Sequence, residues 1–177
     1  MTRLEAIIRS DPALMTVLTR VRDAALPQWR IVSGCLYQTV WNVLTHRPRG
    51  TGIVDIDVIY YDVGDTSWEA EDAVIRRFGT ELQIRNQARV HRWYEQHFGV
   101  PYAPLHSADE SLSRYPVVVQ AVGARLEDDG RLDIVAPFGL DDVFGMVMRP
   151  NPAFPHRETF DAKVARARAI WPEVAVE

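Results

Sequence analysis

The chain has 177 residues, of which 47% are hydrophobic and 25% are charged, a composition that is typical of globular proteins and unlike that of disordered, collagen-like or disulfide-stapled chains. Its 20 Lys and Arg against 24 Asp and Glu give a formal net charge of −4. This balance is the opposite of the basic surface that nonspecific nucleic-acid binding needs, so we expect no duplex DNA partner.

The cysteine content and the N-terminal residues exclude further classes. Cys35 is the only cysteine, which rules out an internal disulfide and a cysteine-based zinc cluster. Residues 1–15 carry charges throughout, and no stretch approaches the roughly 20 apolar residues of a membrane span. We therefore expect a cytoplasmic protein without a membrane partner. The basic residues are 19 arginines and one lysine, Lys163, a bias that we attribute mainly to genomic base composition.

Two helices are predicted at the start of the chain. Thr2 and Glu5 have the spacing of a capping box, and Asp11-Pro12 offers an N-cap followed by proline at the first helical position. The apolar residues between Leu14 and Ala25 recur at three- and four-residue steps, which places them on one helical face.

A strand, a glycine turn and a helix follow. Trp29–Val32 reads as a short strand that ends at Ser33-Gly34, and the apolar spacing up to Leu44 predicts a helix. After the loop Arg47–Gly52, the β-branched and aromatic run Ile53–Tyr61 is the strongest strand signal in the chain.

The remaining elements alternate between helix and strand. They are a helix capped by Thr66 and Glu69 and ending by Gly79, a strand Leu82–Arg85, a helix from Asn86 to Phe98 with Gly99 as its stop, a loop with a short helix over Pro101–Pro116, strands Val117–Leu126 and Leu132–Val135 joined by the turn Asp128-Asp129-Gly130, a short helix Asp141–Met146, a proline-rich turn, and a last helix Thr159–Trp171.

Because helices and strands are interleaved but one pair of strands is a hairpin, the sheet must be mixed. The sequence thus predicts an α+β fold, an α/β sandwich, in one domain over residues 1–177, with N-terminal helices in 1–28, a core sheet with helices in 29–136 and C-terminal helices in 137–177. Trp41, Trp93 and Trp171 lie in helical patterns and are predicted to be core residues.

Two acids in one strand mark the candidate chemistry. Asp55 and Asp57 stand two residues apart, so both side chains project from one face while Ile56 and Val58 pack on the other. Neighbouring carboxylates raise each other's pKa unless a cation lies between them. Mg²⁺ resolves this conflict, since it binds one or two carboxylates together with substrate phosphates. The alternative is a solvated face of an edge strand.

Asp133 and the Ser33-Gly34 turn are further candidates. Asp133 lies in the apolar strand Leu132–Val135, where a charge is costly unless it is offset, although it could equally be an exposed residue beside the hairpin turn. At Ser33-Gly34, glycine lets the backbone approach a ligand, and the first N–H groups of the following helix face an anion, which suits phosphates.

This layout resembles that of the DNA polymerase β-like nucleotidyltransferase superfamily. The segments SGCLYQTVWNVL, DIDVIYYD, NQARVH and APFGLDDVF, in this order, are similar to the motifs of a bacterial nucleotidyltransferase-like family. The resemblance covers the chain from Trp29 to Trp171 and implies the polymerase β-like fold, with a mixed β-sheet flanked by helices.

The resemblance implies roles for individual residues. Asp55, Asp57 and Asp133 would be the catalytic carboxylates that bind Mg²⁺, or Mn²⁺ in its place, and Asp133 would help the acceptor hydroxyl lose its proton. Ser33 and Gly34 would contact the triphosphate of the nucleoside triphosphate.

The chain departs from the superfamily pattern in two ways. Cys35 follows Gly34 where serine or glycine is usual, and 19 residues separate Cys35 from Asp55, which is more than the usual spacing. The additional residues include the loop Arg47–Gly52, which is either a harmless insertion or a change in the shape of the nucleotide pocket.

The NQARVH segment supplies two more candidates for nucleotide binding. Asn86 can cap the following helix, and Arg89 in its first turn would be useful beside a triphosphate. The alternative is that Asn86 only caps and that His91 is a packing residue with its polar atoms satisfied.

The leading hypothesis is a Mg²⁺-dependent nucleotidyltransferase, an enzyme in which an acceptor hydroxyl attacks the α-phosphate of a nucleoside triphosphate and pyrophosphate leaves. One alternative is a noncatalytic nucleotide- or partner-binding module with the same fold. The other is a metal-dependent phosphohydrolase, which uses water as the acceptor. The sequence leaves open which nucleotide is used and what accepts it.

Overall fold

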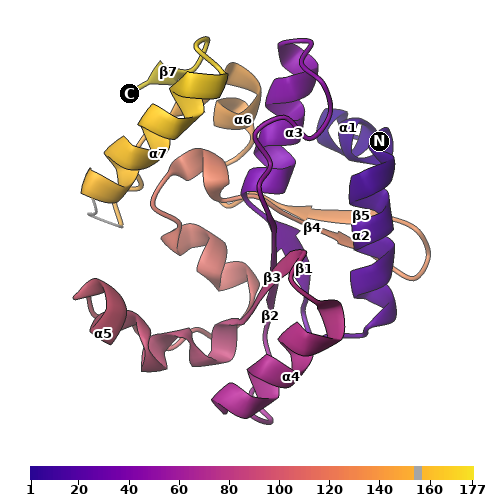
Figure 1. Cartoon of the computed structure of the whole chain (residues 1–177), viewed down its shortest axis with the longest axis vertical. Helices are drawn as coiled ribbons and strands as arrows, with labels where there is room; N and C mark the ends of the chain where they lie inside the picture. The colour runs from indigo at the N-terminus through magenta and orange to yellow at the C-terminus, as the bar shows by residue number, and fades with distance from the viewer. Residues whose placement is uncertain (154–156) are drawn as a thin grey trace.

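The computed structural model describes residues 1–153 and 157–177. Its central sheet contains β1 (Arg30–Val32), β2 (Ile56–Tyr60), β3 (Leu82–Asn86), β4 (Gly123–Leu126) and β5 (Leu132–Val135). The strand order is β3-β2-β1-β4-β5 (Figure 1). β2 and β3 are parallel, whereas the pairs β1–β2, β1–β4 and β4–β5 are antiparallel. The sheet is therefore mixed, as predicted.

Helices flank this sheet. The first half of the chain supplies α1 (Arg3–Arg9), α2 (Pro12–Asp23), α3 (Gly34–Leu44) and α4 (Trp68–Phe78). The second half supplies the short α5 (Tyr94–Phe98) and α6 (Asp141–Gly145), the longer α7 (Arg157–Ile170), three 3₁₀ helices, η1 (Gln87–Arg92), η2 (Asp109–Arg114) and η3 (Val118–Gln120), and a small parallel pair, β6 (Val147–Met148) with β7 (Ala175–Val176). This pair was not predicted from the sequence.

Successive strand residues point to opposite faces of the sheet. Ile31 and Val58 are fully buried on the face that packs against α1 to α4 and forms the main core. Val32 and Ile59 point the other way and pack with Leu112 of η2 in a smaller core. The alternation along β2 places its acidic side chains on this second face.

The C-terminal helix is anchored through tryptophan. Trp171 and Trp41 are buried, as predicted, with their ring centroids 5.4 Å apart in an edge-on arrangement. The indole N–H of Trp171 donates to Asn42 Oδ1 at 3.0 Å, and the amide of Asn42 donates to the carbonyl of Thr51 at 2.9 Å. A Cβ at Gly52 would stand 2.3 Å from the Trp171 ring, so only glycine fits between this loop and α7.

Most predicted helix starts are confirmed. The side chains of Thr2, Asp11 and Asn86 accept hydrogen bonds from the first turns of α1, α2 and η1. Ser67 rather than Thr66 caps α4, because the same capping geometry is available one residue further along the chain.

Three predicted elements differ from the observed ones. The strand expected over Ile53–Tyr61 begins only at Ile56. The helix expected from Asn86 to Phe98 is divided into η1 and α5, since the chain leaves helical geometry between them. The strand expected over Val117–Leu126 begins at Gly123, because the preceding residues turn into η3 and bond to the Arg149–Asn151 segment instead of the sheet.

The last predicted elements lie close to their expected positions. The proline-rich turn falls partly on residues 154–156, which lie outside the described residues, and α7 begins at Arg157 and ends at Ile170. Among the described residues, no helix has both the length and the apolar composition to cross a membrane.

Candidate active site

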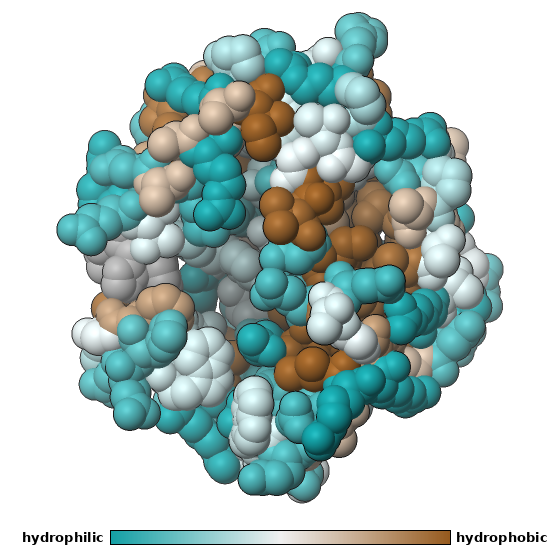
Figure 2. All heavy atoms as spheres, viewed as in Figure 1, coloured by the Kyte–Doolittle hydropathy of each residue, from teal (hydrophilic) through white to brown (hydrophobic). Residues whose placement is uncertain are grey.

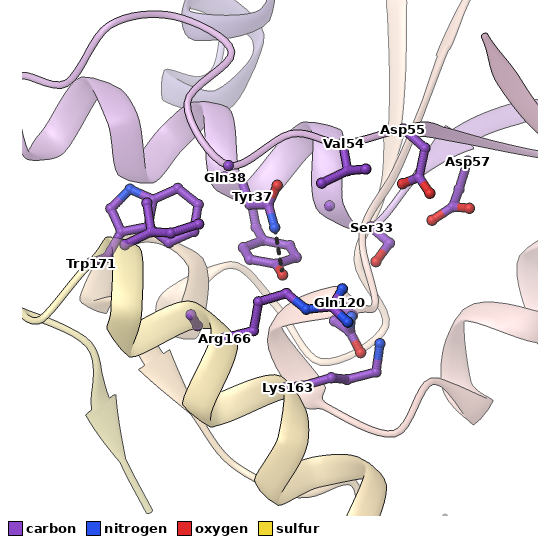
Figure 3. Close-up of a pocket in the computed structure, with 14 residues that line it drawn as sticks. Ser33, Tyr37, Gln38, Val54, Asp55, Asp57, Gln120, Lys163, Arg166 and Trp171 are labelled. Carbon is purple, nitrogen blue, oxygen red and sulfur yellow. Dashed lines mark hydrogen bonds between the residues drawn. The ribbon is translucent and has the colours of Figure 1, made fainter.

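The two acids of the central strand lie side by side. Asp57 belongs to β2 and Asp55 immediately precedes it, and Figure 3 shows both carboxylates directed to the same side as Ser33. Gln83 on the neighbouring β3 donates its amide to Asp55 Oδ2 at 2.7 Å. Burial and the charge of Asp55 together raise the pKa of Asp57 to about 6, while the charges of Lys163 and Arg85 partly offset the shift.

The turn between β1 and α3 forms the adjacent wall. Ser33 has a φ of 61°, which a residue other than glycine rarely adopts. Its side chain does not cap α3 and forms no hydrogen bond within the described part of the chain. At the start of α3, the N–H groups of Gly34 and Cys35 have no backbone acceptor among the described residues, whereas those of Leu36 and Tyr37 donate to the carbonyl of Ser33. Strained turns of this kind are found at ligand-binding positions, where the surroundings hold the backbone in place.

Two cations reach the same cavity from α7. Lys163 and Arg166 line it from the side opposite the strand, and Figure 3 shows both side chains extending toward the polar groups at its centre. Neither has a carboxylate within 4 Å among the described residues. Burial lowers the pKa of Lys163, as does the like charge of Arg166, while Asp57 and Asp55 oppose this shift. The cavity therefore offers two cations that form no close ion pair with any carboxylate of the described residues.

The cavity has a volume of about 110 Å³ and a polar lining. Gln120, only 6% exposed, contributes an Oε1 atom that has no hydrogen-bond partner within the described residues. The segment between α3 and β2 also takes part, since Gly52 and Val54 line the cavity. The long connection between Cys35 and Asp55 was expected to be either a harmless insertion or a change in the shape of the nucleotide pocket. Its contact with the cavity favours the second. The Cys35 thiol is buried in the main core instead of facing the cavity.

The donor set at Asp55 and Asp57 fits a hard divalent cation. Mg²⁺ and Mn²⁺ prefer oxygen ligands, and two adjacent carboxylates with the Ser33 hydroxyl nearby supply only oxygen. The raised pKa of Asp57 indicates the charge repulsion that a bound cation would relieve.

Asp133 does not join this pair. It lies on β5, and β1 and β4 separate it from β2, which corresponds to about 14 Å at the usual spacing of strands. Its carboxylate accepts from the buried Arg30 at 2.7 Å, and Arg30 also binds Asp109. Among the described residues, no group of three or more metal-ligating side chains comes together. The structure therefore gives Asp133 a structural ion pair in place of the expected third position.

Asn86 and Arg89 also lie outside the cavity. Asn86 is 1% exposed and holds the backbone of Asp62, from which its Oδ1 accepts at 3.0 Å. Arg89 pairs with the buried Glu71 at 2.6 Å. Asn86 caps η1, as the alternative expected, but it also bonds to the backbone of Asp62. The Nδ1 atom of His91 is buried without a partner in the described residues, so this histidine is not satisfied as that alternative expected.

Several cavity residues were not predicted. Lys163 was noticed only as a compositional feature, yet a single lysine among 20 basic residues is the signal that could have identified it. Arg166 and Gln120 carry no such signal, because only the docking of α7 and the turn at η3 bring them to β2. Trp93 was expected in the core but is half-buried and lines a second cavity.

Comparisons with known proteins identify the family and the fold. A family model described as nucleotidyltransferase matches residues 19–176. An NMR structure described as revealing a CCA-adding enzyme head domain has a TM-score of 0.79 and 25% sequence identity to this chain, and the match covers 98% of this chain and 94% of that one. No curated protein sequence matches the chain. The family model spans most of the sequence, and the chain therefore belongs to this nucleotidyltransferase family.

Proposed function

We propose that this protein is a Mg²⁺-dependent nucleotidyltransferase that moves a nucleoside monophosphate from a nucleoside triphosphate to an acceptor hydroxyl. The observation that carries the proposal is the cavity itself: the Asp55–Asp57 pair, the strained Ser33-Gly34 turn and the unpaired Lys163 line one polar space. Carboxylates for a cation, helix N–H groups for phosphate and a free ammonium group are together the recognition elements of a metal–triphosphate complex.

Different residues would bind the phosphates and the divalent ion. The N–H groups at the start of α3 and the Ser33 hydroxyl would bind phosphate oxygens, and Lys163 with Arg166 would hold the pyrophosphate end. Asp55 and Asp57 would hold the divalent ion, with Gln83 fixing the position of the Asp55 carboxylate through its 2.7 Å hydrogen bond. The bound ion would neutralise phosphate charge and lower the pKa of the acceptor hydroxyl.

The transfer itself is a displacement at phosphorus. The acceptor oxygen forms a bond to the α-phosphorus, the bond from that phosphorus to the bridging oxygen of pyrophosphate breaks, and the acceptor proton passes to solvent. In this scheme the chain positions two charged reactants and prevents their repulsion. The residues near the reacting centre are the acidic pair and Lys163.

Calorimetric titration with ATP, GTP, CTP and UTP, each with and without Mg²⁺, tests the first step. We expect binding of at least one nucleotide that depends on Mg²⁺ and is lost when Asp55 and Asp57 are both replaced by Asn. Asp128→Asn, an exposed acid in the β4–β5 turn, is the matched control and should bind like the wild type. Equal binding by the double variant and the wild type would refute the assignment.

A noncatalytic binding module is the second candidate, and the position of Asp133 favours it. Asp133 is held by Arg30 on β5 and is not beside the acidic pair, so the site has two carboxylates where the superfamily pattern implies three. Measuring pyrophosphate and free phosphate separates the readings: pyrophosphate release indicates transfer, free phosphate indicates the hydrolase alternative, and binding without either product under all acceptor conditions indicates the binding module.

A further inference from the structure

A second, larger cavity adjoins the first. It has a volume of about 450 Å³ and shares Asp57 and Lys163 with the polar cavity. Figure 2 shows this face of the molecule hollowed between α7 and the α5 segment. The two cavities therefore meet at Asp57 and Lys163, and their other lining residues differ.

The lining of the second cavity is mainly aromatic. Trp93, Tyr94, Phe98, Tyr102 and Tyr115 contribute to it. Tyr94 contacts Tyr102 with 4.4 Å between ring centroids and Phe98 with 4.6 Å. A cavity of this volume with aromatic walls is of the size and chemistry that enclose a small molecule with a flat or apolar body.

Positive charge is present at the edge of this aromatic lining. Arg85 on β3 lies on the same face of the sheet as Asp57, lines the cavity and has no carboxylate within 4 Å among the described residues. Arg114 also lines the cavity, but Glu110 neutralises it at 2.9 Å. Arg85 thus faces the cavity without an ion-pair partner within 4 Å, although its charge also acts on Asp57 and one of its N–H groups donates to the carbonyl of Ile84 at 2.9 Å. A ligand in this cavity is expected to carry an anionic group.

The position relative to the polar cavity indicates which reactant belongs here. An in-line displacement requires the acceptor oxygen and the leaving pyrophosphate on opposite sides of the α-phosphorus. Ser33, Lys163 and Arg166 gather phosphate-binding groups in the polar cavity. The aromatic cavity also reaches Asp57 but, apart from Asp57 and Lys163, is lined by other residues, so an acceptor bound there would approach the acidic pair from outside the phosphate-binding wall.

We propose that the aromatic cavity is the acceptor site, and that the acceptor is a small molecule with a flat ring, a hydroxyl group and a carboxylate or phosphate that Arg85 binds. This inference rests on the proposed nucleotidyl transfer. In the transfer, the acceptor hydroxyl would lie toward Asp57 while its anionic group contacts Arg85.

The test uses the full chain with saturating Mg²⁺ and a nonhydrolysable ATP analogue, and two probes followed by NMR titration. The probes are 3-(4-hydroxyphenyl)propionate and the uncharged 4-ethylphenol. We expect the anionic probe to bind about 10-fold more tightly than the neutral one, as befits one charge-assisted contact. Arg85→Gln should abolish this preference, whereas Arg92→Gln, an exposed arginine outside the cavity, should keep it.

The aromatic contribution has its own pair of variants. Phe98 lines the cavity and is 47% exposed, whereas Phe138 lies outside it and is 41% exposed. Phe98→Leu should weaken both probes by about 3-fold, consistent with loss of part of one aromatic contact, and Phe138→Leu should weaken neither.

Three outcomes overturn the assignment. Equal binding of both probes, or an unchanged preference in Arg85→Gln, shows that the cavity does not select an anionic ring. Weaker binding of the ATP analogue in Arg85→Gln and Phe98→Leu, with displacement of the probe by the analogue, shows that the nucleoside occupies the cavity. Failure of nonhydrolysable analogues of ATP, GTP, CTP and UTP alike to bind the wild type refutes the proposed function instead, and probe titrations without nucleotide then show separately whether the cavity binds aromatic anions.

Discussion

The acids on β2 and the acid on β5 look alike in sequence but occupy opposite electrostatic environments. Asp133 lies against Arg30, which is 4% exposed and binds two carboxylates. Asp57 forms no ion pair within 4 Å among the described residues and lies beside another acid, Asp55, and its pKa is raised to about 6 although Lys163 and Arg85 oppose the shift. A neutralised acid serves the fold, whereas an acid left beside a like charge is available to an external cation.

Replacing Asp57 by Asn should have the largest effect, on the rate of nucleotidyl transfer. Removing one of two metal-binding carboxylates should lower the rate of nucleotidyl transfer by about 1,000-fold or more, which corresponds to about 4 kcal/mol. Pyrophosphate release by purified protein measures it. Asp128→Asn is the control, and a variant at Asp57 that keeps its full rate would contradict the mechanism.

Replacing Lys163 by Met should have the next largest effect. The change keeps the length of the side chain but removes an ammonium group that has no acidic partner in the described structure. We expect Mg²⁺–nucleotide affinity to fall by about 30-fold, the scale of one charged hydrogen bond. Lys163→Arg should restore part of the affinity, and equal binding by all three proteins would exclude Lys163 from the phosphate site.

Asp133→Asn should affect stability and leave nucleotide binding unchanged. Arg30 would keep Asp109 but lose its 2.7 Å contact with Asp133, and we expect the free energy of unfolding to fall by about 2 kcal/mol. Urea unfolding measures the loss, and calorimetry checks that nucleotide affinity changes by less than about 2-fold. Lost affinity in a variant of normal stability would return Asp133 to the catalytic set.

The smallest expected effect concerns the pH dependence of the metal-free protein. A carboxyl whose pKa is higher in the folded than in the unfolded state binds its proton more tightly when folded, so ionised Asp57 destabilises the fold. The contribution of Asp57 to the free energy of unfolding should therefore decrease between pH 4 and pH 6 and be constant above. Asp57→Asn should raise stability by about 1–2 kcal/mol at pH 7.

Thermal unfolding in EDTA at pH 4 and pH 7 measures this difference. The stability gained by Asp57→Asn over the wild type should disappear at pH 4, because Asp57 of the folded wild type is then protonated and, like the Asn of the variant, uncharged. A gain of equal size at both pH values would show that charge is not its cause. Added Mg²⁺ should stabilise the wild type at pH 7 more than the variant.

Local sequence patterns predicted those parts of the candidate site that consist of a few consecutive residues. The alternation of Asp55-Ile56-Asp57 places two acids on one face, and Ser33-Gly34 marks the end of a strand and the start of a helix. Both depend on a few consecutive residues, and both are found where expected. The mixed sheet could be predicted for the same reason, since the β4–β5 hairpin has a local turn signal.

Contacts between distant segments could not be predicted in this way. Lys163 reaches the strand only because Trp171 packs on Trp41 and bonds to Asn42, at a separation of 129 residues. Asp133 was a candidate because an acid in an apolar strand needs an offsetting charge, and the family resemblance then implied its role as the third carboxylate. The compensating group is Arg30 on β1, and nothing in the sequence pairs these residues.

The scarcity of lysine allows the candidate site to be labelled selectively. Every other basic side chain is arginine, so an amine-selective reagent has one side-chain target, with the α-amino group of Met1 as an internal reference. Pyridoxal 5′-phosphate, an anionic aldehyde that condenses with amines, should thus attach at Lys163 alone among the side chains, and mass spectrometry after borohydride reduction would identify the peptide without any mutation. Protection by Mg²⁺–ATP would then give the occupancy of the cavity in the native protein.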